Sequence, residues 1–147
     1  MKRFLKFGVL ALVLVFVAGC EVGGGKKLTC TYKMSANDNS AEYKYVFTFN
    51  KKGDEITKAE MSATAKYDDK DDAKDAKEEA DDDKEDYEDI DGVTYKTKLS
   101  GKTVSATLTA NVKKIDEDDF KSIFNVEIES ELDDVKDTFK DYGFKCK

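Results

Sequence analysis

The sequence predicts a single α+β domain: one antiparallel sheet of about five strands with two or three helices on one face. In several segments apolar residues alternate with polar ones, which is the period of a half-buried strand. In segments 68–91 and 116–142 the apolar residues instead recur every three or four positions, as on one side of a helix. The resulting order is strands, helix, strands, helix, over about 120 residues, which suits one domain with a modest core.

Three strands are predicted first, joined as a meander. The first covers 28–34, and the polar stretch 35–40 after it is turn material. Residues 50–53 form the next hairpin connection, because Gly53 can adopt a positive φ at little cost. A third strand then runs to about residue 67. The second strand carries an aromatic face made of Tyr43, Tyr45, Phe47 and Phe49.

Segment 68–91 is predicted to form one acidic helix. Asp68 or Asp69 is a suitable N-cap, and Gly92 is a suitable stop. The segment contains fifteen acids and four lysines, a net charge of −11, and neighbouring like charges destabilise a helix. We therefore expect this helix to depend on packing against the sheet. The stripe that would pack consists of Ala73, Ala76, Ala80, Tyr87 and Ile90.

The second half of the domain is predicted to add two strands and two short helices. The strands, 93–99 and 104–112, are joined by a turn at 100–102. A short helix carrying Phe120 and Phe124 follows them. The last helix is marked by its apolar spacing and its ends: Leu132, Val135, Phe139 and Tyr142, with an N-cap at Ser130 and a stop at Gly143.

Residues 1–19 are predicted to be a secretory signal peptide. Three cations at the start precede an apolar run at 7–18, which is shorter than the about 20 residues needed to cross a bilayer. Residues 17–20, Val-Ala-Gly-Cys, resemble the bacterial lipobox, in which the cysteine receives a diacylglycerol and becomes the first residue. The resemblance implies that Cys20 anchors the protein by lipid to the extracytoplasmic side of the cell membrane. Residues 20–27, with three glycines, would form a flexible tether to a domain at 28–147.

The two remaining cysteines, Cys30 and Cys146, lie near the two ends of the predicted domain. Outside the cytoplasm such a pair is most simply a disulfide, which would close nearly the whole domain. A redox pair or two free thiols are the alternatives. A redox pair usually has the spacing C-x-x-C, which these residues lack.

Several segments resemble the YehR-like lipoproteins, a small bacterial family of unknown function. The resembling segments are 45–58 (YVFTFNKKGDEITK), 89–93 (DIDGV), 104–123 (VSATLTANVKKIDEDDFKSI) and the ending around 143–145. The resemblance implies an α+β fold and anchoring at the cell surface. It implies no catalytic residues, and the cysteine pair is a departure from its pattern.

Composition excludes several classes of function. The formal net charge is −7, or −10 without the three cations of the signal peptide, and there is no basic stripe for nucleic acid. The chain contains no histidine, the usual general base near neutral pH and the commonest metal ligand. An EF-hand aligned on Gly92 would place Tyr87 and Lys98 at positions that need acids. We predict no enzyme activity, catalytic residue, metal site or cofactor.

These observations favour a monomeric, non-enzymatic, membrane-anchored domain that binds a protein or small-molecule partner. The aromatic face of Tyr43, Tyr45, Phe47 and Phe49 could line a ligand groove, although strand aromatics are far more often core. Two other functions stay open: a cation-responsive envelope protein that uses the acidic helix, and a purely structural envelope component.

The predicted anchor can be tested by mass analysis of the mature N-terminus. We expect the membrane-bound protein to begin at a diacylglycerol-modified Cys20, and a Cys20→Ser variant to lose this modification. An unmodified Cys20 in the membrane fraction would contradict the prediction.

Overall fold

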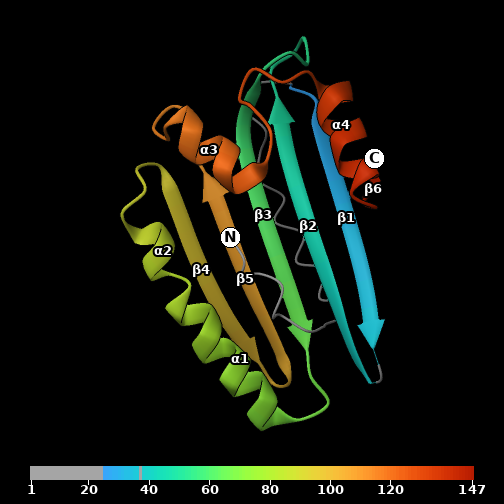
Figure 1. Cartoon of the computed structure of the whole chain (residues 1–147), viewed down its shortest axis with the longest axis vertical. Helices are drawn as coiled ribbons and strands as arrows, with labels where there is room; N and C mark the ends of the chain where they lie inside the picture. Colours follow the sequence, from blue (N-terminus) through green and yellow to red (C-terminus); the bar gives the residue numbers. More distant parts are fainter. Residues whose placement is uncertain (1–24, 37) are drawn as a thin grey trace.

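The computed structural model describes residues 25–36 and 38–147. The predicted signal peptide (1–19), Cys20 and most of the predicted tether lie outside the described residues. The described chain has the predicted α+β class, with one open antiparallel sheet (Figure 1). The sheet has six strands in the order β4-β5-β3-β2-β1-β6.

Five strands are long and one is very short. Their bounds are β1 Lys27–Ala36, β2 Asn39–Phe49, β3 Ile56–Lys66, β4 Val93–Ser100, β5 Thr103–Ala110 and β6 Lys145–Cys146. Sequence analysis missed β6, because two residues are too few to show an alternating pattern. It pairs with β1 at the edge of the sheet, with Cys30 opposite Cys146.

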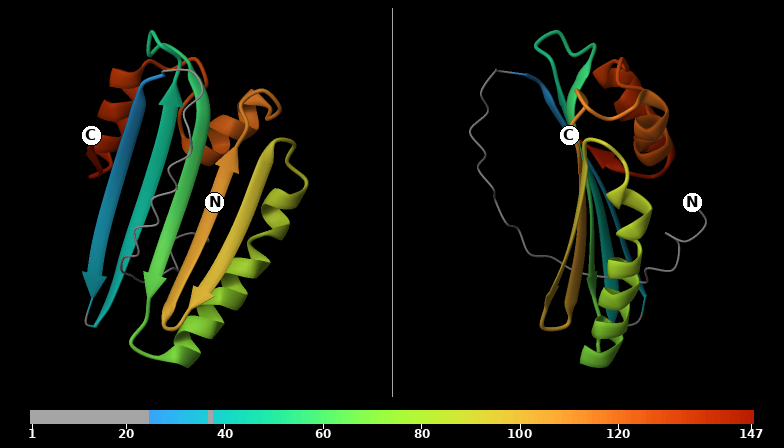
Figure 2. Two further views of the ribbon diagram at one scale, coloured as in Figure 1. Left: turned by 180° about the vertical axis from the view of Figure 1, so that it is seen from behind. Right: turned by 90° about the vertical axis from the view of Figure 1, so that its left-hand side faces the viewer.

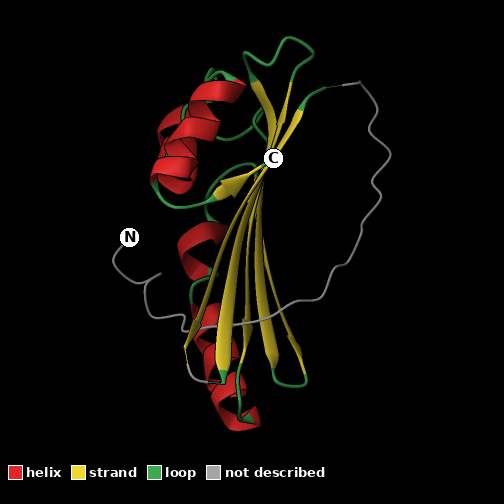
Figure 3. Cartoon of the chain, turned by 90° about the vertical axis from the view of Figure 1, so that its right-hand side faces the viewer, coloured by secondary structure: helices red, strands yellow, loops and turns green. Residues whose placement is uncertain are grey.

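The helices all lie on one side of the sheet, as two edge-on views show (Figures 2 and 3). Their bounds are α1 Lys70–Asp82, α2 Glu85–Glu88, α3 Glu117–Phe124 and α4 Leu132–Asp141. The predicted continuous helix over 68–91 is therefore broken after Asp82. The last turn of α1 is acidic and contains no basic residue, although the C-terminal end of a helix dipole favours cations.

One predicted helix end is confirmed, and two others, at Ser130 and Gly92, differ from their expected roles. Asp69 caps α1, since its side chain accepts a hydrogen bond from the Asp71 backbone N–H. Ser130, however, is not the N-cap of α4: Glu131 holds that position, and the Ser130 hydroxyl accepts from the Glu127 N–H. Gly92 lies four residues beyond the end of α2 and has a φ of 81°.

The main core is aromatic and joins the sheet to α3 and α4. Phe47 of β2 lies 6.0 Å from Phe124 and 5.4 Å from Phe139, measured between ring centroids. A second, smaller core consists of the alanine stripe of α1 packed on β3 and β5: Ala65, Ala73, Ala76, Ala80 and Val104.

Cys30 and Cys146 are joined by a disulfide in the structure, with an S–S distance of 2.00 Å. The bond connects the edge strand β6 to β1 and spans a sequence separation of 116 residues. Cys30 is fully buried beside the main core. The disulfide therefore holds the C-terminal end of the chain against the sheet.

Truncation of the aromatic core should destabilise the domain strongly. Because Phe124 is 1% exposed, Phe124→Ala should leave a cavity and lower the free energy of unfolding by about 3–5 kcal/mol. Met34→Ala is the control, because Met34 is 43% exposed, and it should cost less than about 1 kcal/mol. Urea unfolding of both variants measures this, and equal losses would contradict the assignment of the core.

Candidate functional site

A pocket of about 610 Å³ opens on the helix-bearing face of the sheet. Ligand pockets typically have volumes of about 300–1,000 Å³. The floor of the pocket contains Ala63 of β3 and Ala106 of β5, which lie directly opposite each other in neighbouring strands. Its walls contain four tyrosines, Tyr43, Tyr45, Tyr87 and Tyr95. We call this site the tyrosine pocket.

The tyrosine pocket exists because the helices leave part of the sheet uncovered. α1 and α2 pack over the edge formed by β4 and β5, while α4 packs over β1 and β6 at the other edge. Between them, no helix lies over the middle of β2 and β3 (Figure 1), although Ala65 near the end of β3 packs on the alanines of α1. Ala63 and Ala106 are consequently only half-buried, although they lie on inner strands. Their small side chains leave the floor hollow.

One wall of the tyrosine pocket is fixed by the aromatic core. The Tyr45 ring centroid lies 4.7 Å from that of Phe139 and 5.6 Å from that of Phe144. Tyr43 is two residues away on the same face of β2, opposite Ala63 of β3. Packing of Tyr45 on three rings, including Phe47, restricts its rotamers. This wall is therefore preorganised.

The facing wall is built from a second tyrosine pair. Tyr87 of α2 and Tyr95 of β4 have ring centroids 5.2 Å apart. Tyr87 is 9% exposed, and Tyr95 lies opposite Leu108, which forms part of the floor. The short helix α2 positions Tyr87, so the break after α1 has a direct consequence for the pocket.

The rim of the tyrosine pocket is polar. It contains Asp86 of α2 and residues of α3 and its C-cap: Asp119, Lys121, Ser122 and Asn125. Lys121 is 2.5 Å from Glu127 in an ion pair. The Asn125 side-chain amide donates a hydrogen bond of 2.7 Å to the Tyr142 hydroxyl.

Burial and nearby carboxylates raise the pKa of tyrosines in and beside the pocket. Burial is the larger cause for Tyr95, with Asp83 and Asp81 adding to it, and its pKa rises to about 12. The pKa of Tyr67 also rises to about 12, through burial and then through Glu79. Burial likewise raises the pKa of Tyr43, Tyr45 and Tyr87. These hydroxyls therefore keep their protons to a higher pH than a tyrosine in water does.

The predicted aromatic face of the second strand divides between core and pocket. Phe47 and Phe49 are completely buried, whereas Tyr43 and Tyr45 are half-buried and line the pocket. Sequence analysis missed Tyr87 and Tyr95 as partners of that face. The signal that could have found the site is the recurrence of alanines in the two inner strands, at 59, 63, 65, 106 and 110, because small residues there leave room for a ligand.

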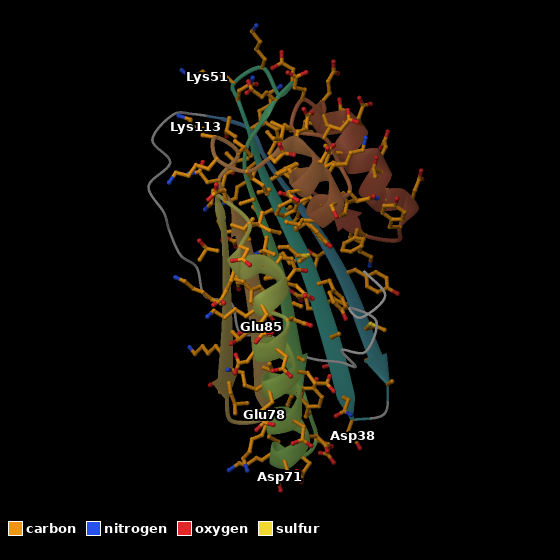
Figure 4. All side chains as sticks on the ribbon, turned by 60° about the vertical axis from the view of Figure 1, so that its left-hand side comes forward. Asp38, Lys51, Asp71, Glu78, Glu85 and Lys113 are labelled. Atoms are coloured by element: carbon orange, nitrogen blue, oxygen red, sulfur yellow. A yellow bond between two sulfur atoms is a disulfide. The ribbon has the colours of Figure 1, made fainter. Side chains whose placement is uncertain are left out.

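The other predicted site residues lie elsewhere. Cys30 and Cys146 are at the β1–β6 edge and do not line the pocket. The acids of α1 and α2 do not converge: Asp71, Glu78 and Glu85 lie one after another along the two helices, exposed to solvent (Figure 4). Within residues 25–36 and 38–147, no three carboxylates or thiols come together to hold a metal ion.

Comparisons with known proteins identify the fold and no activity. The family described as "Protein of unknown function (DUF1307)" matches residues 28–145. The chain is similar to the NMR structure of the Escherichia coli YehR protein, with a TM-score of 0.61, 18% identity, and coverage of 84% of this chain and 92% of that one. It is also similar to an NMR structure of a protein from Streptococcus pneumoniae TIGR4, with a TM-score of 0.57, 13% identity, and coverage of 95% and 94%.

No curated protein matches the chain. At the identities of the two NMR structures, similarity establishes the fold alone. The resemblance to YehR-like proteins is thus confirmed for family and fold, while the lipid anchor stays a prediction. In the part of the chain that the structure describes, no helix is long and apolar enough to cross a membrane.

The raised tyrosine pKa values predict a loss of stability at alkaline pH. The unfolded chain releases its tyrosine protons near pH 10, whereas Tyr67 and Tyr95 release theirs near 12 in the folded domain. The folded state therefore binds more protons between these values, and the free energy of unfolding should fall as pH rises from about 10 towards 12. Urea unfolding across this range measures the slope. Tyr95→Phe should reduce it, and an unchanged slope in that variant would contradict the assignment.

Proposed function

We propose that this chain, which belongs to the DUF1307 family of proteins of unknown function, is a lipid-anchored, extracytoplasmic, non-enzymatic domain that binds a small ligand in the tyrosine pocket. The observation that carries the proposal is the pocket itself. Half-buried alanines on inner strands, between Tyr43 and Tyr45 on one wall and the packed pair Tyr87 and Tyr95 on the other, leave a hollow of about 610 Å³.

The packing around the pocket supports a binding role. Protein interiors are close-packed, and a void among apolar side chains lowers stability. Ala59 and Ala110, four residues from Ala63 and Ala106 along the same strands, are fully buried. The same strands therefore bury alanines where helices cover them and leave Ala63 and Ala106 accessible where they do not. A ligand site requires an apolar surface that stays open to solvent beside fixed walls, and Ala63 and Ala106 provide such a surface.

Two features support the proposed location. A disulfide between Cys30 and Cys146 is a bond that persists in oxidising, extracytoplasmic surroundings. The domain begins at the end of the sheet near Phe49, whose N–H donates to the Lys26 carbonyl at 2.8 Å. A lipid on Cys20 would lie within roughly 20 Å of Lys26, because an extended chain spans at most about 3.5 Å per residue. Lys26 would then lie within about that distance of the membrane surface.

The proposal is tested by filling the floor of the pocket. A thermal-unfolding screen of the oxidised 21–147 fragment against amino acids, sugars, lipids and organic ions should find a ligand that raises the melting temperature. At 100 times its dissociation constant, that ligand should add about 2.7 kcal/mol to the free energy of unfolding. Ala63→Leu should abolish this rise because the added side chain occupies the hollow.

Ser62→Leu is the matched control. Ser62 is the preceding residue on the same strand, is also half-buried, and faces the opposite side of the sheet. It should keep the ligand-induced rise. A rise that survives Ala63→Leu, or a screen in which no ligand raises the melting temperature, would overturn the proposed function.

A further inference from the structure

The rim of the tyrosine pocket carries two carboxylates. Asp86 of α2 and Asp119 of α3 line it from two different helices, and both are exposed. Among the described residues that line the pocket, Lys121 is the one cation, and it forms an ion pair with Glu127. Asp86 itself belongs to the acidic segment 68–91, with its net charge of −11. The mouth of the pocket therefore lies in a negative potential.

The carboxylates also act on the walls of the pocket. After burial and the neighbouring Tyr95, Asp83 and Asp86 are the groups that raise the pKa of Tyr87. Asp83 and Asp81 act in the same direction on Tyr95. The negative charge of α1, α2 and the turn between them thus reaches the tyrosine wall rather than only the outer solvent.

We propose that the tyrosine pocket binds an organic cation with an apolar body. Its apolar body would lie on the floor of Ala63 and Ala106, between the two tyrosine pairs, and its positive charge would face Asp86 and Asp119. This inference rests on the proposed function, because it names the chemical class of ligand for the same site.

The chemistry of the pocket selects this class over two others. Tyrosine faces attract cations, and carboxylates at a rim attract cations and repel anions. An anionic ligand would therefore meet repulsion from both rim carboxylates, Asp86 and Asp119. A sugar would need several hydrogen-bond partners, whereas the floor presents methyl and methylene groups from Ala63, Ala106 and Leu108. An apolar cation matches both the floor and the rim.

The test uses two probe ions of the same shape and opposite charge, tetraphenylphosphonium and tetraphenylborate. Titration calorimetry of the oxidised 21–147 fragment should show tetraphenylphosphonium binding about tenfold or more tighter than tetraphenylborate. The double variant Asp86→Asn/Asp119→Asn should weaken tetraphenylphosphonium binding roughly threefold to tenfold. Ala63→Leu should abolish its binding.

The control removes the same amount of charge elsewhere. Glu78→Gln/Glu85→Gln takes two charges from exposed positions of α1 and α2 that do not line the pocket, and should leave binding nearly unchanged. Equal loss in both double variants would mean that the whole acidic segment attracts the probe, and would overturn the inferred site. Tetraphenylborate binding as tightly as tetraphenylphosphonium, with both lost in Ala63→Leu, would overturn the cation preference while supporting the proposed function.

Discussion

The helices of this domain cover only part of the apolar face of the sheet. Six strands present one continuous face, but α1 and α2 occupy one edge and α4 the other, with α3 over one end. Helices need an apolar stripe to pack, and the stripe of α1 consists of alanines, so it approaches β5 closely and reaches no further across the sheet than Ala65 of β3. Two separate cores result, and the tyrosine pocket lies between them, lined by Leu108 of the main core and by Val104 of the smaller one.

The charge distribution follows from the same arrangement. Because α1 buries only small side chains, its remaining positions are free to be acidic, and it carries its charge along an exposed side. The chain turns at Asp83 and Lys84, which ends α1 and allows α2 to place Tyr87 over β4. One local feature, an acidic helix that stops early, therefore supplies both a wall of the pocket and the negative potential at its rim.

Much of the fold follows from pattern alone, and the site follows only in part. The alternation at 43–49 predicted a strand, but it could not show that Phe47 is enclosed by α3 and α4 whereas Tyr43 is not, since that depends on how far the helices extend. Likewise the stripe through Ala73 and Tyr87 fitted one long helix, and the break between them reflects local charge repulsion that periodicity does not measure. Strand β6 is defined by its pairing to β1, which is a non-local contact.

The most direct measurement is the accessibility of individual alanine methyl groups, by NMR of alanine-methyl-labelled protein with a dissolved paramagnetic probe. An open tyrosine pocket should give strong broadening of the Ala63 and Ala106 methyl signals and little broadening of those of Ala59 and Ala110, which are 0% exposed on the same two strands. Protection of all four methyl groups would mean that the pocket is closed and that the domain has no ligand site on this face.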